Sequence, residues 1–274
     1  MRYRIFAKIF FYILLISISI IVIFPFYWMV SASLKKSNEV FSYPIKWIPD
    51  VIRWENYLDI WNQIPLMTFY KNTLFLAISV TFLSLLTSSL AAYAFSKIKF
   101  PGRNIIFICY ISTIAVPFQV YMIPQFIMMK KLELNDTLLA LILIQTFSAF
   151  GVFLFRQFFI TIPNEISESA RIDGLGEFGI YLRIVLPLSK PAIATLIIFQ
   201  FVFVWNDFLG PLIYLSSTEN KTIQLGIRMF ISQYTAEYSL IMAAAVCSIV
   251  PVIILFMFTQ KLFIEGIATS GIKG

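Results

Sequence analysis

The sequence contains no histidine and only two cysteines, Cys109 and Cys247, among its 274 residues. Histidine is the commonest general base and metal ligand near neutral pH, so its absence counts against an enzyme or a metal centre. Both cysteines lie inside apolar stretches, where a thiol packs as a small hydrophobe, and we therefore predict no disulfide.

Charge is also scarce, since 13% of the residues are Asp, Glu, Lys or Arg, against about a quarter in soluble domains. Hydrophobic residues make up 59% of the chain, which is more apolar surface than a soluble fold can cover. The surplus must face lipid, where only helices and closed barrels satisfy the backbone. The apolar runs are continuous and do not alternate, which predicts an all-α integral membrane protein.

Six intervals of 19 to 28 residues between successive charged positions contain at most one charge, that of Asp207. Each is long enough to cross the roughly 30 Å hydrocarbon layer as a helix. We predict one transmembrane domain over residues 1–274, with six spans at about 9–31, 72–95, 104–129, 137–156, 190–213 and 238–260. A secretory signal ending at Ser31-Ala32-Ser33 is the alternative for the first span, but its apolar run exceeds the roughly 7–15 residues of a signal.

The positions of Lys and Arg predict the orientation of these spans. If the basic amino-terminal segment is cytoplasmic, twelve of the 21 Lys and Arg residues lie inside and nine outside. The short basic loop Lys97–Arg103 is the strongest indication of this orientation, because short loops follow the positive-inside rule most closely. Both termini are then cytoplasmic, and the net charge of +7 calls for no nucleic acid partner.

Two loops are long enough to do more than connect spans. The outer loop, about Lys35–Tyr70, is rich in proline and tryptophan and is either a packed cap over helix ends or a docking surface for an external partner. The inner loop, about 157–189, contains Pro163, a residue suited to the first turn of a helix. Glu165 and Glu168 would lie in the first turns of that helix, where its dipole stabilises acids, and Gly174 would end the helix in a left-handed conformation.

A second amphipathic stretch, Leu175–Leu186, follows in the inner loop, and we expect Pro187 to stop it. The inner loop is therefore predicted to be a helix–turn–helix on the cytoplasmic surface. A helix lying flat on lipid is the alternative, but four acids among four bases, counted from Arg156 to Lys190, make a plain lipid anchor the poorer interpretation.

The stretch Glu168-Ser169-Ala170-Arg171-Ile172-Asp173-Gly174, followed after nine residues by Ile184-Val185-Leu186-Pro187, resembles a known family signature. It is similar to the EAA loop of permease subunits of binding-protein-dependent ABC importers, with Ser169 in place of the first alanine. The end of the second span, Ala91–Phe95 followed by Phe100–Arg103, and Trp205–Phe208 with Pro211-Leu212 in the fifth span also look like this family. The tail from Phe263 to Gly274 is similar to the ending of its carbohydrate-uptake class. Within that class the chain resembles the second, six-span permease of maltose-type systems.

The resemblance implies a bacterial or archaeal plasma-membrane complex of this subunit, a second permease subunit and two ABC ATPase subunits. An extracytoplasmic solute-binding protein would deliver a sugar or oligosaccharide, with a glycerol phosphate as the alternative solute. The chain has no G-x-x-x-x-G-K-[ST] loop, so ATP and Mg would be bound on the partner ATPases and no cofactor on this chain. The residues implied to couple to the ATPase are Glu168, Ser169, Ala170, Asp173, Gly174, Ile184 and Pro187.

Within that segment, Glu168 is expected to form a charge-assisted contact with a cationic ATPase residue. Gly174 is expected to supply a turn in which a side chain would clash or be strained. The resemblance also suggests that the tail Gly271–Gly274 approaches the ATPase.

An acid inside a membrane span is a functional candidate by default, and Asp207 is one. It could line an outer vestibule in which Trp205 and Asn206 stack on and hydrogen-bond to a sugar. We favour a hydrogen-bonded structural acid, because in maltose-type relatives the sugar contacts come mainly from the other permease.

Two other classes of protein fit the sequence less well. A secondary transporter would show inverted repeats or discontinuous helices with polar residues at mid-membrane, and the sequence has no evident repeat. A membrane-embedded enzyme would need converging His, Asp, Glu or Cys residues at membrane depth.

Overall fold

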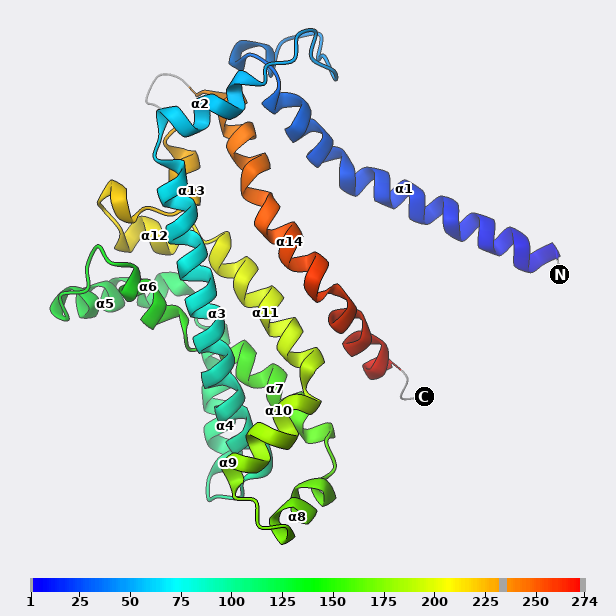
Figure 1. Cartoon of the computed structure of the whole chain (residues 1–274), viewed down its shortest axis with the longest axis vertical. Coiled ribbons are helices and arrows are strands. Elements are labelled where there is room, and N and C mark those ends of the chain that lie inside the picture. The colour runs from blue at the N-terminus through cyan, green and yellow to red at the C-terminus, as the bar shows by residue number, and fades with distance from the viewer. Residues whose placement is uncertain (1, 232–235, 272–274) are drawn as a thin grey trace. The chain divides into compact units, whose positions relative to one another are not determined.

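The computed structural model describes residues 2–231 and 236–271 (Figure 1). Regular structure in these residues is helical, apart from an isolated bridge between Ile231 and Ala236, so the predicted all-α class is confirmed. The principal helices are α1 (Arg2–Ser33), α2 (Glu55–Gln63), α3 (Leu66–Lys97), α4 (Arg103–Ser112), α5 (Phe118–Lys131), α6 (Leu138–Gln145), α7 (Ala149–Thr161), α8 (Asn164–Ile172), α9 (Glu177–Ile180), α10 (Leu186–Leu188), α11 (Lys190–Trp205), α12 (Leu209–Tyr214), α13 (Ile223–Arg228) and α14 (Tyr238–Gly271).

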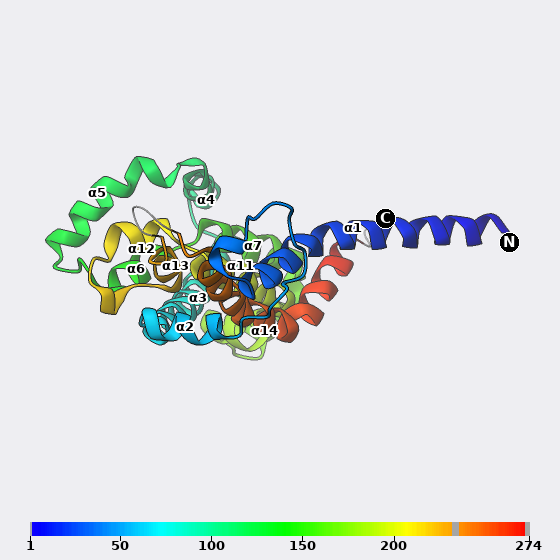
Figure 2. The same ribbon diagram turned by 90° about the horizontal axis from the view of Figure 1, so that it is seen from above.

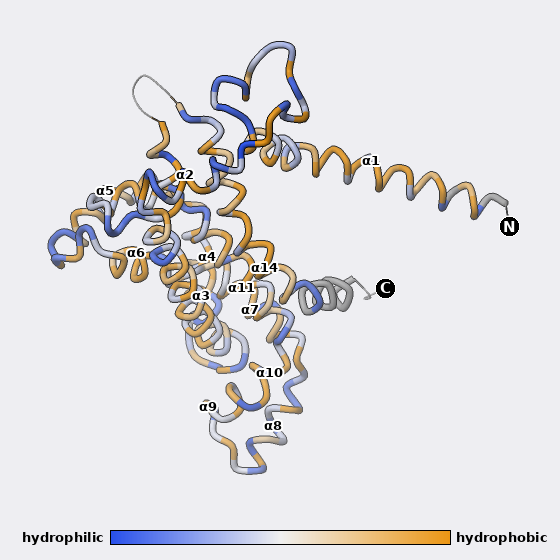
Figure 3. Tube along the Cα trace, turned by 45° about the horizontal axis from the view of Figure 1, so that its top comes forward, coloured by the Kyte–Doolittle hydropathy of each residue, from blue (hydrophilic) through white to orange (hydrophobic). Residues whose placement is uncertain are grey.

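The chain forms two compact units. The first unit comprises Met1–Met67 and Gly226–Pro251, and the second comprises Thr68–Leu225 and Val252–Gly274. The first unit contains α1, whose apolar side chains stay exposed around the helix, with Phe10 70% and Ile21 71% exposed. A helix that is hydrophobic on every side belongs in lipid, as the long orange segments of Figure 3 illustrate.

The outer loop of the first unit is packed at its base. Asn56 in α2 is buried and donates to the carbonyl oxygens of Ser33 and Lys35, each at 2.8 Å. Lys35 is 1% exposed, lies 4.4 Å from the ring centroid of Trp28 and donates to the carbonyl of Lys46. Burial lowers the pKa of Lys35, and the nearby Glu39 opposes this shift. The base of the loop is thus a packed cap, as one of the two interpretations predicts.

The helices account for six membrane crossings only if each pair of helices joined by a sharp bend is counted as one crossing. Four helical segments are long and apolar enough to span a membrane, and two further pairs reach that length with a bend between their halves. The first pair, residues 103–115 with α5, is bent by 100°. Pro117 explains the position of this bend, because a residue before proline avoids the helical region and Val116 has φ −82° and ψ 114°.

Regular helix is interrupted within three of the predicted spans, 104–129, 137–156 and 190–213. The fourth span is interrupted at residues 146–148, and the Ser148 hydroxyl oxygen accepts the Gly151 N–H at 3.0 Å to start α7. The fifth span is interrupted at residues 206–208. Pro211 favours that break, since in a continuous helix it could not donate to the Asp207 carbonyl.

The second unit has its main apolar core between α3, α4, α7 and α11 and the segment that follows α7. Phe155 and Phe159 of α7 are fully buried in this core, together with Ala92 of α3 and Leu196 of α11. Figure 1 places α8–α10 at one end of these helices, and Figures 1 and 2 show α5, α6 and α12 gathered on one side of the second unit. The core therefore holds the inner loop against three spans.

Gly151 marks the closest approach of α3, α7 and α11. A Cβ atom at this position would lie 2.5 Å from Ser88 Oγ and 3.1 Å from Leu196 Cδ2. We expect Gly151→Ala to lower the melting temperature of the purified protein, because overpacking a tight core costs roughly 1–3 kcal/mol. Gly176→Ala is the matched control, since a Cβ there meets no atom within 4 Å. Equal melting temperatures for the two variants would contradict the packing.

Candidate functional site

The inner loop is a helix–turn–helix whose turn depends on Gly174. α8 begins after Pro163, which precedes the helix with φ −56°, and it carries Glu165 in its first turn and Arg171 in its last. Gly174 has φ +87°; its N–H donates to the Arg171 carbonyl at 3.0 Å, and the Leu175 N–H donates to the Ala170 carbonyl at 2.9 Å. This pair of bonds is a Schellman motif, which ends a helix at a left-handed residue, as the sequence predicts.

The two faces of α8 have opposite characters. Ala170 is 4% exposed and packs into the apolar core of the second unit. Glu168, Ser169 and Asp173 are exposed, and Ile172 is 87% exposed. Figure 3 shows hydrophilic and hydrophobic positions mixed along this segment. α8 therefore presents acids and two large apolar side chains, Ile166 and Ile172, outward while its inner face is fixed.

The second half of the inner loop differs from the prediction in where it ends. It comprises α9, a π-helical turn η3 (Tyr181–Val185) and α10, in which Pro187 is the middle residue. Proline is tolerated in the first turn of a helix, so Pro187 does not stop this stretch, which ends at Ser189. Ile184 packs against the apolar core, whereas Pro187 is exposed.

A polar chain of contacts ties the inner loop to α3. Arg171 Nε lies 2.7 Å from Glu177 Oε1, and the Tyr93 hydroxyl donates to Glu177 Oε2 at 2.7 Å. The Arg171 guanidinium, and then the Tyr93 hydroxyl, hold the pKa of Glu177 below its ordinary value. Lys97 donates to the Ile162 carbonyl at 2.6 Å. Sequence patterns did not identify Glu177, Tyr93 or Lys97 as partners, because their contacts span 65 to 84 residues.

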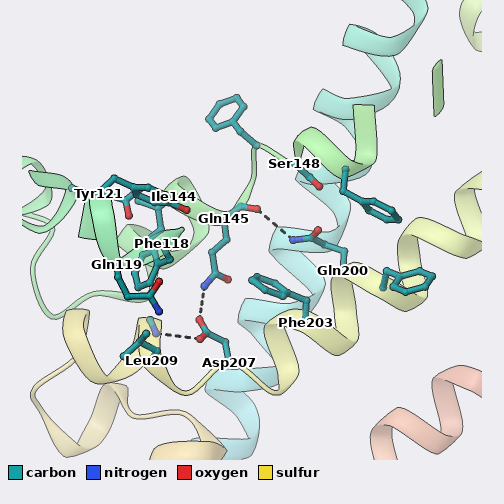
Figure 4. Close-up of a pocket in the computed structure, with 15 residues that line it drawn as sticks. Phe118, Gln119, Tyr121, Ile144, Gln145, Ser148, Gln200, Phe203, Asp207 and Leu209 are labelled. Atoms are coloured by element: carbon teal, nitrogen blue, oxygen red, sulfur yellow. Dashed lines mark hydrogen bonds between the residues drawn. The ribbon is translucent and has the colours of Figure 1, made fainter. Parts of the chain in front are cut away.

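A cavity of about 630 Å³ lies in the second unit, between α5, α6, α11 and α12 (Figure 4). Its walls include residues at or beside the interruptions of the three bent or broken spans, namely Phe118, Gln145, Ser148 and Asp207. Non-helical backbone at membrane depth is tolerated where it is buried in protein or lines a wet cavity. The breaks and the cavity are therefore parts of one feature.

Asp207 is fixed on one side of the cavity. Its Oδ2 accepts from Gln145 Nε2 at 2.7 Å and its Oδ1 accepts the Gly210 N–H at 3.1 Å (Figure 4). A Cβ on Gly210 would lie 2.4 Å from Asp207 Oδ2, so only glycine leaves room for this arrangement. The favoured interpretation of Asp207 as a hydrogen-bonded acid agrees with this geometry.

The other two predicted pathway residues do not line the cavity. Trp205 is 1% exposed and stacks on Phe201 with ring centroids 5.5 Å apart. Asn206 is exposed, and its amide donates to the Val202 carbonyl of its own helix at 3.0 Å. The cavity instead brings together glutamines that no sequence pattern identified, including Gln119, Gln145 and Gln200.

The tail expected to approach an ATPase falls largely outside the described residues. The structure describes the chain as far as residue 271, so no position is assigned to 272–274.

Known proteins resemble this chain over nearly its whole length. Residues 84–268 match the family described as binding-protein-dependent transport system inner membrane component. The arabinooligosaccharides transport system permease protein of Bacillus subtilis is 38% identical, with 99% of this chain and 96% of that protein covered. The sn-glycerol-3-phosphate transport system permease protein of Yersinia pestis is 34% identical, with 96% of each covered.

The same relationship holds in three dimensions. A solved structure of a bacterial ABC transporter involved in the import of the acidic polysaccharide alginate matches with a TM-score of 0.82 and 26% identity. The match covers 95% of this chain and 97% of that one. The chain therefore belongs to the family of binding-protein-dependent transport system inner membrane components, and it is a multi-pass membrane permease of an ABC importer, not an enzyme.

Proposed function

We propose that this permease pairs with a second permease and two ABC ATPase subunits to import an oligosaccharide delivered by a solute-binding protein. ATP and Mg belong to the ATPase subunits in this scheme. The chain contributes half of the translocation pathway and one mechanical connection to an ATPase.

The observation that carries the proposal is the construction of the inner loop. A loop that only joined two spans would need neither a helix fixed on one face nor an outward row of acids. Glu168 lies on the free face of α8, where its carboxylate is available for a charge-assisted hydrogen bond to a cationic ATPase side chain. The exposed Ile172 beside it supplies apolar surface to the same contact.

The polar contacts to α3 give the loop its mechanical role. α8 follows α7 directly and α10 leads into α11, so a displacement of the loop acts on both spans. The Arg171–Glu177–Tyr93 chain extends the connection to α3. Movement of a docked ATPase would thus tilt three helices together and bias the pathway between inward and outward access.

The names of the relatives support a carbohydrate as the solute. The permease from Bacillus subtilis is named for arabinooligosaccharides, and the alginate importer transports an acidic polysaccharide. The relative from Yersinia pestis is named for sn-glycerol 3-phosphate, which keeps a glycerol phosphate as the second candidate.

The distribution of charge supports the orientation in the plasma membrane. With both termini and the inner loop cytoplasmic, the basic loop Lys97–Arg103 lies inside, as the positive-inside rule requires. The outer loop then faces the solute-binding protein and offers it Tyr43, 95% exposed, and Trp54, 65% exposed. Exposed aromatic side chains are typical anchors at protein interfaces.

The test is purification of the tagged chain from its own membranes in mild detergent, followed by reconstitution in proteoliposomes with the binding protein. We expect an ABC ATPase and a second permease to co-purify. Uptake of arabinotriose or maltotriose should require ATP on one face of the membrane, and a thiol reagent should label Ile172→Cys from that same face. Isolation of the chain alone, uptake without ATP, or labelling of Ile172→Cys from the exterior of intact cells would refute the proposal.

A further inference from the structure

The cavity has the dimensions and setting of a small-molecule site. Its volume of about 630 Å³ lies within the roughly 300–1,000 Å³ typical of ligand pockets. It is lined from α5, α6, α11 and α12, and the breaks at 146–148 and 206–208 open backbone and polar side chains onto it. A continuous set of helices would present only side chains there.

Aromatic residues are prominent in its lining. Six lining residues are aromatic: Phe118, Tyr121, Phe147, Phe150, Phe199 and Phe203. Phe147 is 68% exposed and Phe203 62% exposed, so large parts of both rings remain available. Flat apolar faces beside a few placed polar groups suit a ligand whose own faces are apolar and whose edges are polar, which describes a sugar ring.

The polar groups between the rings are mainly primary amides. Gln119 lines the cavity, and its side chain makes no hydrogen bond to the described part of the chain. Gln200 makes a single long contact, from its Nε2 to the Gln145 carbonyl at 3.4 Å. Each amide both donates and accepts, which matches hydroxyl groups that do the same.

One of these amides has a buried oxygen that lacks a hydrogen-bond donor. Gln145 donates to Asp207, but its Oε1 is buried and has no hydrogen-bond partner among the described residues. A buried acceptor without a donor is unfavourable and unusual in a native structure. A solute hydroxyl that supplied the missing donor would remove this cost.

The lining also indicates the charge of the ligand. None of the described residues that line the cavity is Lys or Arg, and Asp207 brings a carboxyl group. Phosphates and carboxylates are recognised by cationic side chains, and a nearby acid would repel them. An anionic solute is therefore disfavoured at this position.

We propose that this cavity is a binding site for an uncharged sugar ring on the import pathway. Gln119, Gln145 and Gln200 form hydrogen bonds to the hydroxyl groups of the sugar, and Phe203 packs against its apolar face. The inference rests on the proposed function and narrows it, since it favours a neutral oligosaccharide over a glycerol phosphate or a uronate. It also assigns solute contacts to this subunit, which the family resemblance does not lead one to expect.

The first experiment detects occupancy at the cavity itself. In the complete complex, with Cys109→Ala and Cys247→Ala, Gln119→Cys provides a thiol whose rate of reaction with a maleimide is measured. We expect arabinotriose or maltotriose to slow labelling about fivefold or more, because a bound ligand buries most of its surface against its pocket. sn-Glycerol 3-phosphate and a mannuronate trisaccharide should leave the rate unchanged. Gln224→Cys, a glutamine of the same unit that does not line the cavity, should respond to none of them.

The second experiment measures transport. Gln200→Leu and Phe203→Ala should each reduce ATP-dependent uptake of the neutral sugar about tenfold, the scale of one lost polar contact for Gln200 and of one lost stacking contact for Phe203. The amount of co-purified ATPase should not change, and Gln224→Leu should transport like the parent.

The outcomes separate the two proposals. If the parent complex imports a neutral sugar but labelling is not slowed by it, the sugar site is refuted and the permease function stands. Protection by the anionic probes, or a thiol that the maleimide never reaches in the complete complex, refutes the site equally. If no ATP-dependent uptake occurs, the proposed function itself fails.

Discussion

Replacing Glu168 and Gly174 together, as Glu168→Lys and Gly174→Val, is expected to remove the ATPase from the purified complex. The charge reversal converts the attraction for a cationic ATPase residue into repulsion. The valine cannot keep the left-handed φ of +87° without strain of about 1–2 kcal/mol, so the turn after α8 changes course. A Cβ at Gly174 meets no atom within 4 Å, and the effect is therefore conformational and not a clash.

We expect at least a tenfold loss of co-purified ATPase, equivalent to about 1.4 kcal/mol or more of docking free energy, and a matching loss of uptake. The control is Glu165→Lys with Gly176→Val. Glu165 is also an exposed acid of α8, and Gly176 has φ −73° and ψ 167°, which valine adopts without strain. Retention of the ATPase by the Glu168 and Gly174 variant would show that α8 is not the docking element.

Replacing Glu177 by glutamine is expected to have a different effect, in which ATP hydrolysis continues but uptake per ATP falls about tenfold. Glutamine at this position can accept from Tyr93 or Arg171 through one oxygen, whereas the carboxylate accepts from both. The α8 face that is proposed to meet the ATPase stays intact. The fold stays intact as well, because an ion pair whose side chains are 41% and 44% exposed contributes only about 0–1 kcal/mol.

Tyr93→Phe breaks the same chain at its other end and provides a double-mutant test. If Glu177 and Tyr93 act as one unit, the double variant should be no worse than either single variant. Additive losses, or a Glu177→Gln protein with the parental ratio of sugar to ATP, would contradict a role in transmission.

The Glu177 contact also predicts how transmission depends on pH. Because the Arg171 guanidinium and the Tyr93 hydroxyl lower the pKa of Glu177 below 4.5, its favourable contribution is fully present above that value. The contribution is lost only as the pH falls through the lowered pKa. Coupling should therefore be flat across neutral pH, and a loss between pH values of about 6 and 8 would require another group.

The sequence predicts the membrane helices and the inner loop because both depend on local rules. Long apolar intervals identify crossings wherever they occur, and Gly174 follows a short helix that carries an acid in its first turn. The Schellman turn at this glycine needs no information from distant residues.

The helix interruptions are harder to predict, because apolar content continues through them. Pro117 is a visible signal for the first break, but proline is also tolerated inside membrane helices, as Pro25, Pro124 and Pro251 show here. The breaks at 146–148 and 206–208 contain no proline of their own. Discontinuous helices were expected to mark a secondary transporter; this importer permease has them as well, so they do not distinguish the two classes.

The glutamines of the cavity carried no pattern that the sequence could reveal. Gln119, Gln145 and Gln200 lie on three different helices, and each one alone is an ordinary polar residue in an apolar run. Only the bend after α4 and the breaks beside α6 and α11 bring them together. The same reason explains why Trp205 and Asn206, which were candidates for the pathway, lie outside the cavity.

An interrupted crossing behaves as two short rods joined by a hinge. A break bends more readily than a continuous helix, because fewer bonds of the helical ladder cross it and have to stretch. If an ATPase docks on the inner loop as proposed, a torque at the end of α11 nearest α10 would turn that helix about Asn206–Phe208, while α12 stays packed against α6. The walls of the cavity would then be reshaped by rotation at the breaks, and no whole helix would have to move through the surrounding lipid.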